Sequence, residues 1–170
     1  RDCTIIMPTT SARVKIDAVK GYNATVVMVD TSKQSRADKV AEIHARYPSA
    51  HIASAYDCEW VIKGNASLGR EIASSNYAFD RVVCPVGGGG LSSGIITGLC
   101  ELGSQIPVWG AEPLMANDAA CSLRQNTLIR HDIEPQTLAD GARTLSLGQR
   151  NFEVLKNGMP EIVEVSEDNI

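Results

Sequence analysis

The fold of this chain is decided by the stretch Val82-Val83-Cys84-Pro85-Val86-Gly87-Gly88-Gly89-Gly90-Leu91-Ser92-Ser93-Gly94. A short apolar segment typical of a strand leads into four consecutive glycines, and a helix-like segment follows them. Because glycine has no side chain, backbone N–H groups at such a junction can converge on an anion at the helix N-terminus. The stretch therefore predicts a phosphate site that needs no lysine. The alternative is a flexible turn.

Two common phosphate motifs do not describe this loop. A P-loop ends in Gly-Lys-Ser or Gly-Lys-Thr, whereas Gly90 is followed by Leu91 and Ser92. The dinucleotide fingerprint requires glycine at its first, third and sixth positions, and the sixth position here is Ser92 or Ser93 in either register. We therefore expect a phosphate that belongs to neither a nucleoside triphosphate nor NAD.

Composition places the chain among ordinary α/β proteins. Its 170 residues are 44% apolar, and the net charge is −4. Scattered lysines and arginines and the lack of a long apolar run predict that neither nucleic acid nor membrane is a partner. Five widely spaced cysteines predict reduced, mostly buried thiols of a cytoplasmic protein rather than a zinc site; they are Cys3, Cys58, Cys84, Cys100 and Cys121.

Strand-like and helix-like segments alternate along the chain. Strands are expected at residues 4–7, 24–29, 51–54, 82–86, 108–111 and 161–165. Helices are expected after Ser11 as N-cap, through Val40 and Ile43, over residues 59–73, after the glycine loop, and over residues 118–124. This succession of βαβ units predicts a parallel sheet flanked by helices, with ligands at the carboxyl ends of the strands.

Four stretches carry a resemblance to a known family: Ile6-Met7-Pro8 with Val14-Lys15; Pro85-Val86 with the glycines and Leu91; Gly110-Ala111-Glu112-Pro113; and Thr137-Leu138-Ala139-Asp140-Gly141. The chain resembles the fold type II, tryptophan synthase beta-like pyridoxal-phosphate enzymes of the threonine dehydratase, serine dehydratase and serine racemase group. The resemblance implies two α/β domains with the cofactor between them. It places residues 1–54 in the small domain and residues 55–170 in the large cofactor-binding domain, with the fold incomplete at both ends.

The same resemblance implies two binding sites. The phosphate of pyridoxal phosphate would be bound by Gly87, Gly88, Gly89, Gly90 and the amide of Leu91. A divalent cation, Mg²⁺ or Ca²⁺, would be held by Glu112, the backbone carbonyl of Ala116 and Asp118, all of them oxygen donors. The alternative for these two acids is a pair of surface carboxylates near the start of a helix.

The activity implied is that of a threonine/serine ammonia-lyase, which converts a β-hydroxy amino acid into a 2-oxo acid and ammonia. Two alternatives stay open: a serine or aspartate racemase, and a noncatalytic phosphate-binding or oligomerising remnant. No lysine lies in the family's Ser-x-Lys-x-Arg-Gly context, so no catalytic residue is assigned in this chain. The expected partners are a small amino-acid substrate and a second copy in a homodimer.

No chemical role is assigned to Tyr56, to residues 63–67 or to the three histidines. Tyr56 either lines the cofactor pocket or is a packed loop aromatic. Residues 63–67 depart from the family's Ala-Gly-Gln-Gly-Thr helix start, which leaves the substrate open. His44, His51 and His131 are not at metal-ligand spacing, so we expect surface or packing roles for them.

Overall fold

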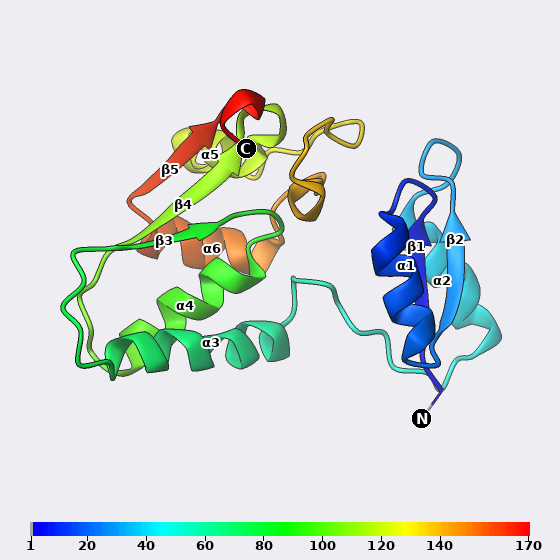
Figure 1. The fold of residues 1–170 in the computed structure, drawn as a ribbon, viewed down its shortest axis with the longest axis horizontal. Helices are drawn as coiled ribbons and strands as arrows, with labels where there is room; N and C mark the ends of the chain where they lie inside the picture. The colour runs from blue at the N-terminus through cyan, green and yellow to red at the C-terminus, as the bar shows by residue number, and fades with distance from the viewer. Residues whose placement is uncertain (1) are drawn as a thin grey trace. The chain divides into compact units, whose positions relative to one another are not determined.

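The computed structural model describes residues 2–170, which fall into two compact units separated between Ala53 and Ser54 (Figure 1). The assignment of these units to a small and a large domain remains a prediction.

The first unit is a βαβ arrangement followed by a second helix. It contains β1 (Thr4–Pro8), α1 (Arg13–Gly21), β2 (Thr25–Val29) and α2 (Arg36–Arg46), and β1 pairs with β2 in parallel. Ser35 is the N-cap of α2, and its side chain accepts a hydrogen bond from the amide of Asp38. The expected Ser11 cap is wrong, since Ala12 occupies the N-cap of α1 without a side-chain acceptor. The expected strand at residues 51–54 is also wrong, because these mostly exposed residues pair with no strand.

The second unit holds a three-stranded parallel sheet with the order β3-β4-β5. Its main elements are α3 (Glu59–Ala73), β3 (Val82–Pro85), α4 (Gly90–Glu101), β4 (Val108–Pro113), α5 (Asp118–Gln125), α6 (Gln149–Gly158) and β5 (Glu161–Val165). Short 3₁₀ turns lie at Leu114–Ala116, Asp140–Ala142 and Glu167–Asn169. The predicted α/β class with parallel strands and flanking helices is confirmed. The sequence pattern did not predict α6.

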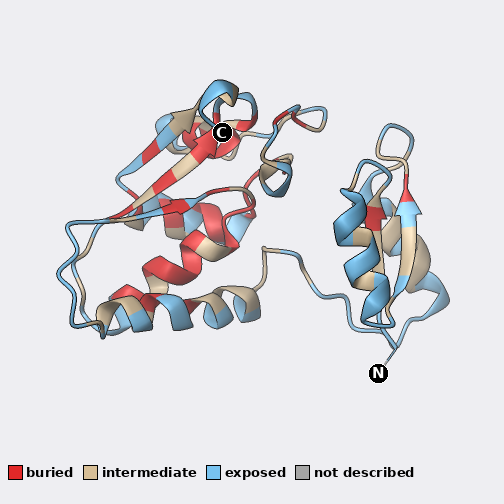
Figure 2. Ribbon diagram, in the orientation of Figure 1, coloured by how far each residue is buried: buried red, intermediate tan, exposed pale blue. Residues whose placement is uncertain are grey.

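The core of the second unit forms where α4 and α6 pack on the sheet. Buried residues gather along α4 and the central strand β4 (Figure 2). Ile95 and Leu99 of α4, Leu155 of α6 and Ile162 of β5 belong to one apolar cluster. Since α4 is buried over most of its length, the loop that precedes it is fixed by the core.

Helices α3 and α4 approach each other unusually closely because glycines line their contact. A Cβ on Gly69 would overlap the carbonyl oxygen of Ile95, and one on Gly98 would overlap that of Ala66. A Cβ on Gly94 would overlap the side chain and backbone of Asn65. We call Gly69, Gly94 and Gly98 the glycine contact; it brings α3 against α4, the helix that follows the glycine loop.

The expected burial of the cysteines is wrong for most of them. Only Cys84 is buried, whereas Cys3 and Cys100 are exposed and Cys58 and Cys121 are partly buried. Among residues 2–170, none of the helices combines the length and the apolar character that crossing a membrane requires.

Candidate functional site

The glycine loop connects the end of β3 to the start of α4, at the carboxyl end of a parallel strand. Gly87 and Gly88 follow the strand, Gly89 is the N-cap of α4, and Gly90 is the first helical residue. Gly89 has a φ of 89°, in the left-handed region that glycine adopts without a steric penalty. The loop thus sits at the positive end of a 12-residue helix.

The carbonyl groups of the loop point into the protein. The oxygen of Gly88 accepts hydrogen bonds from the amide of Gly148 at 3.1 Å and from Nδ2 of Asn151 at 2.8 Å. The oxygen of Gly89 accepts from the amide of Ser93 at 2.9 Å. The backbone oxygens of Gly88 and Gly89 are therefore committed to internal partners.

The amide groups of the loop are uncommitted. Within the described part of the chain, none of the five expected phosphate ligands donates its backbone N–H to another group; these are Gly87, Gly88, Gly89, Gly90 and Leu91. Buried amides are normally paired, so a row of undonated N–H groups at a helix N-terminus suits an anion. The geometry argues against a flexible turn, and the phosphate site itself stays a prediction.

The neighbours of the loop explain why it is glycine-rich. A Cβ on Gly88 would collide with the ring of Tyr56, and one on Gly87 would lie 3.1 Å from the carbonyl oxygen of Gly141. The family-like stretch 137–141 and the segment after it are thus brought to the loop from far along the chain. Tyr56 packs on the loop itself.

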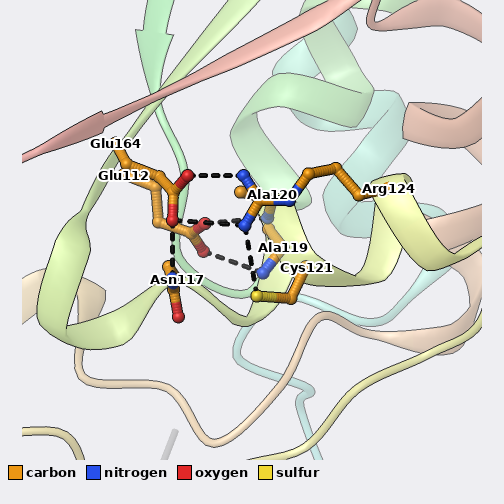
Figure 3. Close-up of polar contacts among 7 residues, drawn as sticks. All are labelled: Glu112, Asn117, Ala119, Ala120, Cys121, Arg124 and Glu164. Carbon is orange, nitrogen blue, oxygen red and sulfur yellow. Dashed lines mark hydrogen bonds and ion pairs between the residues drawn. The ribbon is translucent and has the colours of Figure 1, made fainter.

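A second cluster lies where β4 ends and α5 begins. The carboxylate of Glu112 accepts hydrogen bonds from the amides of Ala119 at 3.0 Å and Ala120 at 2.9 Å (Figure 3). Glu112 is only 1% exposed. Burial raises its pKa to about 8, and the nearby Asp118 carboxylate acts in the same direction, while the two amides oppose the shift.

Asp118 is the other acid of the cluster, and it is equally buried. Burial raises the pKa of Asp118 to about 7, while the backbone amides of Leu147 and of Asp118 itself act in the opposite direction. Neither carboxylate oxygen has a hydrogen bond of ordinary geometry within residues 2–170, and Nε2 of His131 lies 3.7 Å from Oδ1. The alternative of two surface carboxylates is therefore wrong, and the expected surface or packing role of His131 stays a prediction.

Two buried acids with little compensating positive charge fit a bound cation. The backbone of Ala116, which is also buried, lies between them in sequence. The residues that the structure describes contain no group of three or more His, Cys, Asp or Glu side chains placed to hold a metal. The candidate cation site thus has two carboxylates, and that of Glu112 already accepts hydrogen bonds from amides of α5. The metal assignment stays a prediction.

A network of one ion pair and one hydrogen bond lies next to this cluster. Arg124 of α5 pairs with Glu164 of β5, which also accepts a hydrogen bond from Nδ2 of Asn117 (Figure 3). The Arg124 guanidinium is the largest cause that lowers the pKa of Glu164. Nothing local in the sequence indicated this network, because its members are brought together by the pairing of β4 with β5.

Comparisons with known proteins agree on one family. The family model described as pyridoxal-phosphate dependent enzyme matches residues 2–170. A serine racemase of Schizosaccharomyces pombe is 32% identical over 166 residues, covering 98% of this chain and 51% of the relative. A catabolic L-threonine dehydratase of Staphylococcus aureus (strain N315) is 32% identical over 169 residues, covering 99% and 48%.

Solved structures give the same result. A threonine deaminase of T.th. matches with a TM-score of 0.87 and 32% identity, covering 98% of this chain and 55% of that one. The serine racemase of Dictyostelium discoideum matches with a TM-score of 0.83 and 30% identity, covering 98% and 52%. The chain therefore spans about half the length of these relatives.

Proposed function

Since the chain belongs to the family of pyridoxal-phosphate dependent enzymes, we propose that it is part of a threonine or serine ammonia-lyase. The reaction converts a β-hydroxy amino acid into a 2-oxo acid and ammonia. The observation that carries the proposal is the row of undonated amides in the glycine loop, at the N-terminus of a buried helix.

The role proposed for this chain is to anchor the cofactor by its phosphate. Backbone N–H groups of Gly87, Gly88, Gly89, Gly90 and Leu91 would bind the phosphate oxygens, and the dipole of α4 would favour the negative charge. When bound, pyridoxal phosphate supplies an electron sink for the α-carbon of the substrate. The fixed loop would hold the ring in place while leaving the reacting face to the amino acid.

A racemase is the second candidate. Relatives of this chain include a serine racemase from Schizosaccharomyces pombe as well as a threonine dehydratase. Removal and return of the α-proton use the same cofactor as elimination, so the phosphate loop would serve either reaction. A small amino-acid substrate, a homodimer and a cytoplasmic location complete the proposal.

A divalent cation is part of the same proposal. Mg²⁺ or Ca²⁺ would be held by Glu112, the carbonyl of Ala116 and Asp118, with water completing the shell. Its support is the buried Asp118 carboxylate, which has no hydrogen bond of ordinary geometry within residues 2–170. The cation would neutralise a pair of acids whose pKa values burial raises to about 8 and about 7.

The loop assignment is tested by replacing Gly88 with Asp and titrating the chain with pyridoxal phosphate or inorganic phosphate, followed by ³¹P NMR. Gly88→Asp adds a Cβ where the Tyr56 ring lies and a negative charge beside the anion, so binding should be lost. Gly64→Ala is the matched control, because its Cβ meets nothing within 4 Å. Unchanged phosphate affinity in Gly88→Asp would refute the site.

The activity is tested separately by measuring ammonia released from L-threonine and L-serine by the chain with added pyridoxal phosphate. Release above the rate of the cofactor alone supports the ammonia-lyase. Chiral analysis of serine recovered from the same mixture reports racemisation. Phosphate binding without either product would show cofactor anchoring alone, which is the role proposed for this chain.

A further inference from the structure

Asn151 lies in the first turn of α6, is fully buried, and touches the glycine loop. Its side-chain nitrogen donates to the carbonyl oxygens of Gly88 at 2.8 Å and of Tyr56 at 3.1 Å. Both partners are acceptors only, so the amide orientation is fixed: the reverse would set three oxygens against one another. The side-chain amide of Asn151 thus donates hydrogen bonds to backbone carbonyls of two separate segments.

The hydrogen bond to Gly88 also determines where the next amide points. The Gly88 carbonyl and the Gly89 N–H belong to one planar trans peptide, in which the two groups point in opposite directions. Asn151 and the amide of Gly148 both bind that carbonyl on the α6 side. The Gly89 N–H is therefore turned away from α6, among the other undonated amides of the loop.

The start of α6 is itself held in place. The carboxylate of Asp57 accepts from the amides of Gln149 and Arg150, each at 3.1 Å. A Cβ on Gly89 would lie 2.8 Å from the Cβ of Asn151, so helix and loop are in direct contact. The backbone at Asn151 is consequently held in a fixed position next to the glycine loop.

We propose that Asn151 is a positioning residue for the phosphate loop, acting by holding the Gly88 carbonyl away from the anion. The proposal rests on the proposed phosphate-binding function. A peptide between two glycines rotates easily, because neither residue has a Cβ to oppose it. Without the Asn151 donor, only the Gly148 amide, at 3.1 Å, would hold the Gly88 carbonyl, and rotation of the peptide would turn an oxygen toward the anion and replace an attraction with a repulsion.

The experiment uses the chain labelled with ¹⁵N-glycine and titrated with inorganic phosphate, with the glycine amide signals followed by NMR. Asn151→Leu removes the donor at similar volume and should weaken phosphate binding about tenfold or more, with a displaced Gly89 signal. The matched control is Asn157→Leu in the same helix, an exposed residue whose side chain donates to the carbonyl of Glu153. It should leave the dissociation constant unchanged.

The outcomes separate this inference from the proposed function. If the unsubstituted chain shows no amide shift with phosphate or pyridoxal phosphate, the proposed function falls, and this inference with it. If that chain binds and Asn151→Leu binds equally well at an unchanged unfolding temperature, only the role of Asn151 is overturned.

A second variant keeps the test decisive should Asn151→Leu not fold. Asn151→Asp has the same shape; its protonated acid can donate to Gly88, and its ionised form cannot. Without phosphate present, the Gly89 amide signal should match the unsubstituted chain below the pKa of the new carboxyl and move above it. A signal that stays at the unsubstituted position throughout overturns the proposal.

Discussion

The buried acids Glu112 and Asp118 predict that the chain loses stability as the pH rises. Burial raises the pKa of Glu112 from 4.5 to about 8 and that of Asp118 from 3.8 to about 7. Each acid therefore binds its proton more tightly in the folded than in the unfolded chain. The stabilisation is complete below about pH 4 and is lost as the pH rises through 7 to 8.

The size of this loss follows from the shifts. One pKa unit corresponds to about 1.4 kcal/mol, so Glu112 alone accounts for on the order of 5 kcal/mol. The two acids raise each other's cost of ionisation, so their contributions do not add. A loss of roughly 3 to 5 kcal/mol is large beside the 5 to 15 kcal/mol of a typical domain.

The assay is urea unfolding followed by circular dichroism between pH 5 and 8.5, with and without Mg²⁺ or Ca²⁺. We expect the free energy of unfolding to fall by several kcal/mol across this range without a cation, and less steeply with one, because the cation favours the ionised pair. Glu112→Gln should flatten the profile, whereas Glu153→Gln, at an exposed position of α6, should not.

Two results would contradict this reasoning. A free energy of unfolding that stays constant or rises from pH 5 to 8.5 would mean that the acids are not protonated in the folded chain. A profile that neither Mg²⁺ nor Ca²⁺ alters at pH 8 would remove the cation site.

Three further substitutions test the structure around the sites. Gly98→Ala should cost about 3 kcal/mol or more in urea unfolding, because its Cβ would overlap the backbone of Ala66; a loss below 1 kcal/mol would contradict the close helix contact. Asp57→Ala should lower stability by about 1 kcal/mol in thermal unfolding by removing the acceptor at the start of α6, and no change would mean that this cap is not formed. Arg124→Gln should cost less than about 1 kcal/mol, since the Arg124 side chain is 57% exposed; a loss above 2 kcal/mol would argue for a buried network.

Much of the fold was predictable because its elements carry local signals. The helix at Glu59–Ala73 and the strand at Glu161–Val165 have the bounds that their patterns predicted. The prediction of a strand at residues 51–54 was wrong because a short apolar run becomes a strand only when another strand pairs with it. The pattern did not reveal α6, whose first turn buries the polar Asn151.

The same distinction between local sequence signals and long-range contacts applies to the candidate sites. The glycine loop was recognisable because four adjacent glycines report a local backbone requirement. The burial of Asp118 and its closeness to His131 depend on segments that meet only in three dimensions. The same holds for Asn151 and Gly88, which are 63 positions apart in the sequence.

The glycine contact between α3 and α4 also limits which amino-acid replacements this sequence can accept. Gly69, Gly94 and Gly98 touch no expected ligand, yet any other amino acid at these positions introduces atoms where a neighbouring main chain or Asn65 already lies. In a saturation library selected for retained folding, we expect them to be as intolerant of replacement as Gly88 and Gly89 of the glycine loop, whereas Gly64, whose Cβ would meet open space, accepts change. Invariance at such positions among descendants of this gene would record helix proximity rather than chemistry.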